Sequence, residues 1–148
     1  MKTESPSPSS ASVSKRLPLL RGYTQEFYDW CHKHELRFQR CRKCGTWRHP
    51  PRPMCGSCHS MEWEWAPTGG RGKVHCWTIV HQALDPAFAG EVPYAVAIVE
   101  MDEGPRLATW VTGISLSELR IGMPVEVWFD DIAESVALAK FRPLAGNV

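Results

Sequence analysis

Residues 41–58 read CRKCGTWRHPPRPMCGSC and contain two Cys-x-x-Cys pairs with ten residues between them. Each pair forms a tight turn that directs two sulfurs at one point, and the intervening loop brings the second pair beside the first. Four thiolates in that arrangement suit one tetrahedral metal ion. The predicted ligands are Cys41, Cys44, Cys55 and Cys58.

We predict that the ion is a structural Zn²⁺, and iron in a rubredoxin-like site is the main alternative. His49 and His59 lie within or beside the motif. Either could replace a cysteine, but four cysteines already fill a tetrahedral shell. No open coordination position is evident, so the metal is expected to have no catalytic role.

The chain has 148 residues, of which 43% are hydrophobic, so it can bury a real core in one domain or two small ones. Its charges are distributed unevenly. Residues 1–72 carry 12 basic and 6 acidic side chains, whereas residues 73–148 carry 5 basic and 10 acidic ones. Residues 1–72 and residues 73–148 are therefore expected to have different functions.

Residues 1–16 are rich in Ser and Pro and have no apolar stretch after their charges, so they read as a mobile tail and not as a secretory signal. We expect a cytoplasmic protein in a reducing compartment. No apolar run is long enough to span a membrane. Outside the metal motif, Cys31 and Cys76 are expected to be ordinary small core residues.

An amphipathic helix is predicted after this tail, with Thr24 as its N-cap. Apolar and aromatic side chains recur at helical spacing, and Tyr28 widens the stripe that they form. One interpretation is packing on its own domain; the other is docking of an aromatic surface on a partner protein. The stripe consists of Phe27, Trp30, Cys31 and His34.

A short strand from Leu36 to Arg40 is expected to lead into the first cysteine pair, and Trp63 and Trp65 alternate as in a half-buried strand. The turn-rich segment Pro67-Thr68-Gly69-Gly70-Arg71-Gly72 is expected to mark the end of this metal module. Five β-rich runs follow, with one helical turn near Ser117–Arg120, which predicts a small five-stranded barrel. The runs are Lys73–Gln82, Tyr94–Met101, Arg106–Thr112, Val125–Asp130 and Ser135–Phe141.

Basic residues surround the cysteine pairs, and guanidinium groups bind phosphate oxygens well. Their simplest role is to offset the anionic metal centre, and a phosphorylated small molecule or a nucleic acid backbone are the functional alternatives. The acidic barrel half disfavours nucleic acid, since such barrels normally offer a basic groove. The basic residues are Arg40, Arg42, Lys43, Arg48 and Arg52.

No nucleophile elbow, phosphate-binding glycine loop or Ser/His/Asp pattern occurs in the sequence, so no catalytic residue is assigned. Its motifs, in order, resemble the zinc-ribbon plus OB-fold proteins of domain-of-unknown-function family 35. The resemblance covers residues 25–143. It rests on Phe27-Tyr28, Cys41-Arg42-Lys43-Cys44-Gly45, Pro50-Pro51-Arg52-Pro53, Cys55-x-x-Cys58, Gly70-Arg71-Gly72-Lys73-Val74, Pro93-Tyr94, Asp102-Glu103-Gly104-Pro105, Ile121-Gly122-Met123-Pro124-Val125 and Phe141-Arg142-Pro143.

The resemblance implies a mainly β fold: a disordered tail (1–22), an N-terminal docking helix (23–35), a rubredoxin-like zinc ribbon (36–68) and a five-stranded OB-fold barrel (69–148). It also implies an accessory subunit of a thiolase-superfamily enzyme, a thiolase or aldolase, that acts on acyl-CoA. A CoA ester would then be a ligand of the complex, with Arg42, Lys43, Arg48 and Arg52 near its phosphates and Phe27, Tyr28 and Trp30 at the partner interface. A single-stranded nucleic-acid-binding module is the alternative function.

Overall fold

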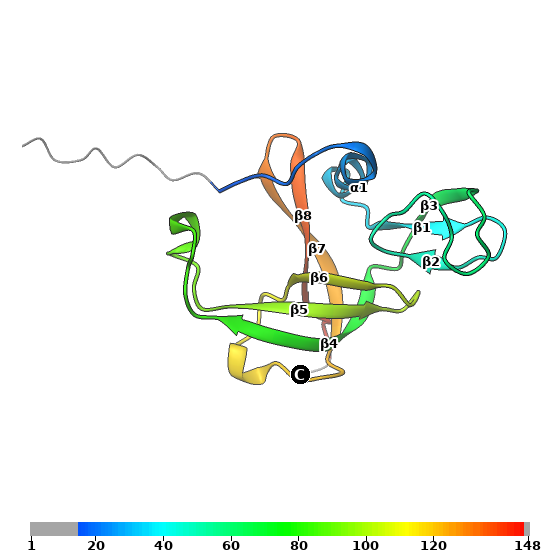
Figure 1. Cartoon of the computed structure of the whole chain (residues 1–148). Helices are drawn as coiled ribbons and strands as arrows, with labels where there is room; N and C mark the ends of the chain where they lie inside the picture. The colour runs from blue at the N-terminus through cyan, green and yellow to red at the C-terminus, as the bar shows by residue number, and fades with distance from the viewer. Residues whose placement is uncertain (1–14, 147–148) are drawn as a thin grey trace, which may run out of the picture.

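A computed structural model describes residues 15–146 (Figure 1). The predicted tail therefore lies largely outside the described residues. The first regular element of the described chain is helix α1, Gly22–His32, which starts directly after Arg21 without a side-chain cap. The expectation that Thr24 caps the helix is wrong, since Thr24 lies inside its first turn. The helix buries Phe27 and Cys31 of the predicted stripe, whereas Trp30 is half-buried and His34 lies beyond the helix and is exposed.

The metal module contains a three-stranded antiparallel sheet in the order β2-β1-β3. Its strands are β1 (Arg37–Cys41), β2 (Trp47–Arg48) and β3 (Trp63–Pro67). The predicted entry strand is confirmed, with its start and end one residue later, and it delivers Cys41 directly. Trp63 and Trp65 share a face as predicted, with ring centroids 5.7 Å apart in an edge-to-face arrangement.

Five antiparallel strands form the second sheet, in the order β6-β5-β4-β7-β8. They are β4 (Arg71–Val80), β5 (Tyr94–Met101), β6 (Arg106–Trp110), β7 (Pro124–Ala133) and β8 (Val136–Pro143). All five predicted strands are present, and the bounds predicted for β5 are confirmed. The predicted helical turn is the 3₁₀ turn η2, Leu116–Glu118, and a second such turn, η1 (Pro86–Phe88), was not expected.

Strand β4 begins at Arg71, although its glycine-rich start suggested a break before Lys73. The glycines allow close approach of neighbouring strands. A Cβ atom on Gly72 would lie 2.4 Å from the carbonyl oxygen of Glu100, and one on Gly70, whose φ is +68°, would lie 2.7 Å from Val127 Cγ1. These positions therefore need glycine to let β4 meet β5 and β7.

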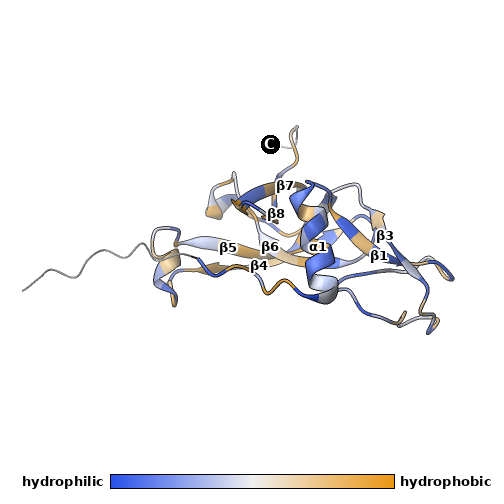
Figure 2. Cartoon of the chain, turned by 90° about the horizontal axis from the view of Figure 1, so that it is seen from above, coloured by the Kyte–Doolittle hydropathy of each residue, from blue (hydrophilic) through white to orange (hydrophobic). Residues whose placement is uncertain are grey.

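The barrel closes where β6 ends, through a parallel bridge between Val111 and Phe141. The Thr112 N–H donates to the Phe141 carbonyl at 2.8 Å, and the Thr109 hydroxyl donates to the Ala139 carbonyl at 2.7 Å. We call this line of contact between β6 and β8 the seam. Beside it, α1 packs against β8 and adds Phe27 to the barrel core. Figures 1 and 2 show the helix next to the barrel, on the side from which the ribbon projects.

The two cysteines outside the metal motif have different environments. Cys31, on the inner face of α1, is completely buried as expected, and burial raises its pKa to about 12. Cys76 is exposed, so the expectation that it belongs to the core is wrong. A β-bulge between Val74 and Cys76 moves the side chains that follow it to the opposite face of β4.

Within residues 15–146, no helix combines the length and apolar character that a membrane span requires.

Candidate functional site

The four predicted ligands converge, with their sulfurs all within 4.8 Å of one another. The Cys41 and Cys58 sulfurs are 3.6 Å apart, as are those of Cys44 and Cys55. Zn–S bonds of about 2.3 Å in a tetrahedron separate sulfurs by about 3.8 Å. The thiolates therefore fit a closed zinc site, which would hold the ion without leaving a position for substrate.

The two cysteine turns repeat one backbone design. The N–H groups of Gly45 and His59 donate to the carbonyls of Cys41 and Cys55, at 2.9 and 3.0 Å. Gly45 and His59 both have positive φ, +73° and +59°. His59 thus occupies the left-handed position that glycine fills in the first turn, which explains its presence beside the site without a ligand role.

Hydrogen bonds favour the thiolate form of Cys44 and Cys55, whereas burial and the neighbouring sulfurs raise the pKa of Cys58 to about 12. The Thr46 hydroxyl lies 3.1 Å from the Cys44 sulfur, and with the Thr46 backbone it lowers the pKa of Cys44 to about 6. The pKa of Cys55 is lowered by the backbone N–H groups of Cys58 and Ser57. Each donor stabilises a negative sulfur, so the site is prepared for a cation.

His49 is packed in an aromatic layer that joins the helix to the ribbon. Its ring lies 5.1 Å from Phe27 and 4.8 Å from Phe38, measured between ring centroids. Burial lowers the pKa of His49 to about 4, and its Nδ1 is buried without a hydrogen-bond partner among the described residues. His49 is therefore a neutral packing residue in the folded protein.

Acid should consequently destabilise the fold through His49. Between its unfolded pKa of 6.5 and its folded pKa of about 4, only the unfolded chain binds this proton, so the free energy of unfolding falls as pH falls. The maximum loss is about 3 kcal/mol. Chemical denaturation at several pH values should give a smaller loss for His49→Phe, while acid effects on the cysteines are common to both proteins. Equal losses would contradict the assignment.

One of the predicted phosphate-binding residues is used inside the ribbon. Arg48 Nε donates to Gln39 Oε1 at 2.7 Å, and its Nη2 donates to the carbonyl of Arg52 at 2.9 Å. The backbone N–H of Arg52 also donates to Gln39 Oε1, at 2.7 Å. Arg48 and Gln39 therefore fix the loop between the cysteine pairs, a role for which the sequence analysis gave no signal.

The other basic residues of the ribbon remain at its surface. Arg42 lies 3.5 Å from the Glu64 carboxylate, and the side chains of Lys43 and Arg52 are exposed. Arg40 lies over the Trp47 ring at 5.5 Å. The ribbon thus presents three of the four residues predicted to contact phosphate, namely Arg42, Lys43 and Arg52.

The three aromatic residues assigned to a partner interface differ in exposure. Phe27 is 8% exposed and stacks on Phe38, so the chain itself already covers most of its side chain. Tyr28 is half-buried, and burial raises its pKa. Trp30 is also half-buried, with Arg37 and Lys33 over its ring at 4.0 and 4.4 Å. Tyr28 and Trp30 are therefore the two that reach the surface.

Comparison with known proteins identifies the family. The rubredoxin-like zinc ribbon domain of ChsH2 matches residues 32–64, and the C-terminal OB-fold domain of ChsH2 matches residues 65–130. A solved chain of the Ltp2-ChsH2(DUF35) aldolase is 36% identical, with a TM-score of 0.79 over 86% of this chain and 98% of that one. The chain belongs to the DUF35 family. The predicted zinc ribbon and OB-fold are thereby confirmed.

Relatives of this DUF35 chain carry different names. A DUF35 domain-containing scaffold protein of Methanocaldococcus jannaschii is 36% identical over 64% of this chain and 67% of the relative. A probable enoyl-CoA hydratase alpha subunit of Thermomonospora curvata is 38% identical over 79% of this chain. The chain spans 36% of that subunit's length, so the similarity concerns one part of a larger protein.

Proposed function

We propose that this DUF35 chain is a non-catalytic accessory subunit that binds and supports a thiolase-superfamily enzyme, a thiolase or retro-aldolase, acting on acyl-CoA. The observation that carries the proposal is its 36% identity to the DUF35 chain of the Ltp2-ChsH2 aldolase, of which it covers 98%. The acyl-CoA hydratase name of the Thermomonospora relative supports the same substrate class. The complex would act in the degradation of steroid side chains or of aromatic acyl-CoA compounds.

The metal chemistry of the chain supports a structural role for this subunit and a catalytic role for the partner enzyme. Among residues 15–146, the single cluster of potential metal ligands is the four-cysteine site. Because its four thiolates fill a tetrahedral zinc shell, the ion would stiffen the ribbon and would not activate water or a carbonyl. The catalytic groups are therefore assigned to the partner enzyme.

The ribbon is proposed to face the CoA phosphates of the bound acyl-CoA. Arg52 lies in the loop whose conformation Gln39 and Arg48 fix, Lys43 lies in the first cysteine turn, and both side chains are exposed. Fixing the loop reduces the entropy lost when its cations meet phosphate. Arg48 contributes through this loop, and Arg42, Lys43 and Arg52 through their charges.

The surface of α1 is proposed as part of the partner interface. Buried tryptophans at interfaces often contribute about 2 kcal/mol or more to binding, and Lys33 and Arg37 already restrain the Trp30 ring. We expect Trp30→Ala to weaken association with the partner by at least about tenfold in isothermal titration calorimetry. The matched control is Ile121→Ala, since Ile121 is 73% exposed on a barrel loop and should leave affinity unchanged. Equal affinities of the two variants would contradict this interface.

Co-expression with a thiolase-superfamily enzyme of the same organism tests the proposal as a whole. We expect one heteromeric peak in size-exclusion chromatography, and acyl-CoA turnover that depends on both chains. Full activity and stability of the enzyme alone would overturn the proposal. A labelled oligonucleotide that binds the isolated chain at low salt, and is released as salt rises, would favour the nucleic-acid alternative.

A further inference from the structure

A groove of about 430 Å³ follows the seam between β6 and β8. Its walls come from α1, from the ends of the barrel strands and from residues 15–18, which precede the helix. No residue of the predicted ribbon, 36–68, lines it. Small-molecule sites typically occupy 300–1,000 Å³, so the groove has the size of a ligand site separate from the basic ribbon.

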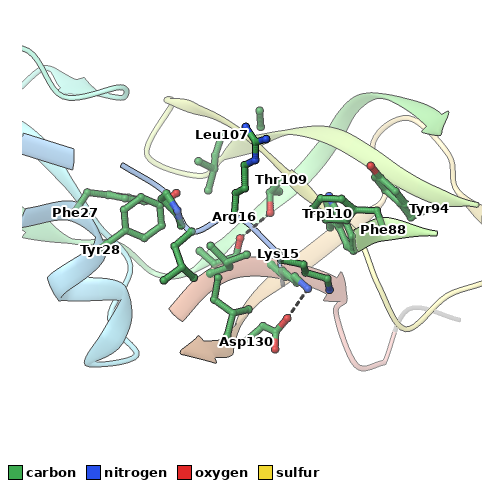
Figure 3. Close-up of a pocket in the computed structure, with 17 residues that line it drawn as sticks. Lys15, Arg16, Phe27, Tyr28, Phe88, Tyr94, Leu107, Thr109, Trp110 and Asp130 are labelled. Atoms are coloured by element: carbon green, nitrogen blue, oxygen red, sulfur yellow. Dashed lines mark hydrogen bonds and ion pairs between the residues drawn. The ribbon is translucent and has the colours of Figure 1, made fainter. Parts of the chain in front are cut away.

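Aromatic rings gather at both ends of the groove (Figure 3). Tyr94 and Trp110 stack at one end, with centroids 4.2 Å apart and planes inclined by 25°. Phe88 completes this cluster, 6.2 Å from Trp110. Phe27 and Tyr28 lie at the other end. Such walls favour flat apolar groups, which can stack on or pack edge-on against the rings.

Three charged groups along the groove, those of Lys15, Asp130 and Lys140, form ion pairs, whereas Arg16 forms none within residues 15–146. Lys140 Nζ lies 2.5 Å from Asp130 Oδ2 and 4.6 Å from the Trp110 ring centroid. Lys15 forms an ion pair with Glu91 beside Phe88. The Thr109 hydroxyl already donates to the Ala139 carbonyl. The groups that are already paired offer a ligand no new ion pair, so its binding would rest mainly on the aromatic and apolar walls.

The barrel itself explains why a groove exists there. Beyond Thr109, the described residues show no further hydrogen bond between β6 and β8, so the seam widens toward Leu107 and Leu138. Residues 15–18 cross the opening without regular secondary structure, and Leu17 is still 51% exposed. They therefore form a wall without filling the space beneath with their own apolar side chains.

We propose that the β6–β8 groove binds a planar, largely apolar ring system of a small molecule. The ring would stack at the Phe88, Tyr94 and Trp110 end and extend along the seam toward Tyr28. This binding needs neither the partner enzyme nor the basic ribbon, so it goes beyond the accessory function and can be tested separately.

Titration of the full-length, zinc-loaded chain with prodan, an uncharged naphthalene fluorophore, tests the proposal. We expect saturable binding with a blue shift of prodan emission. Absence of saturable binding up to the solubility limit would overturn the proposal.

Two variants locate the binding, after circular dichroism has shown that they fold. Trp110→Ala removes the stacking surface, and Ala108→Trp places a large side chain beside it from an exposed position on β6. Each should weaken prodan binding at least tenfold. The matched control is Trp47→Ala, which removes a half-buried tryptophan from the ribbon and should change the affinity less than twofold. Equal effects of Trp110→Ala and Trp47→Ala, or unchanged binding by Ala108→Trp, would refute this location.

Discussion

Cys55→Ser is expected to unfold the zinc ribbon while the barrel stays folded. Cys55 is completely buried, and its sulfur lies 3.6 Å from that of Cys44. Binding of a structural Zn²⁺ contributes on the order of 10 kcal/mol to folding of small cysteine-ligated modules. The three ribbon strands are only two to five residues long, so their hydrogen bonds and packing cannot replace that free energy. Hydrogen exchange should therefore show loss of protection in residues 36–68 and retained protection in β4–β8.

Cys76→Ser is the matched control, because it also replaces a thiol by a hydroxyl but at an exposed site outside the cluster. It should leave the zinc content and hydrogen exchange unchanged. Metal analysis of protein purified without added zinc completes the test. A red, iron-loaded protein would contradict the choice of zinc, and an intact ribbon in Cys55→Ser would contradict the structural role of the metal.

Phe141→Ala is expected to lower the free energy of unfolding of the barrel by about 3–5 kcal/mol. Phe141 is completely buried in β8, at the point where its carbonyl accepts from Thr112 and closes the barrel. Truncation would leave a cavity against several strands that cannot all move to fill it. Urea denaturation followed by far-ultraviolet circular dichroism measures the change.

Leu84→Ala serves as the control for this substitution. Leu84 is 90% exposed in the loop between β4 and β5, so its truncation should change stability by less than about 0.5 kcal/mol. Zinc content should be unchanged in both variants, since the four cysteine ligands lie in the ribbon, outside the barrel sheet. A loss of less than about 1 kcal/mol for Phe141→Ala would mean that the barrel core is not organised around this ring.

Most of the architecture could be predicted because its determinants are local. The Cys-x-x-Cys turns, the alternation of Trp63 with Trp65 and the turn residues between the β-rich runs each act over a few positions. Errors occurred where long-range contacts overrode the local pattern. The bulge in β4 exposes Cys76, and the Gln39 side chain binds Arg48, which was predicted to contact phosphate, inside the ribbon.

The sequence alone determined the metal ligands, the order of helix, ribbon and barrel strands, and the family to which they point. The tertiary structure decided which side chains remain at the surface: Phe27 is buried and Arg48 turns inward, whereas Trp30, Lys43 and Arg52 reach the surface. It also produced the groove, because the β6–β8 seam joins segments about 30 residues apart. Ligand spacing is set by the local chain, but burial and cavities depend on which distant segments meet.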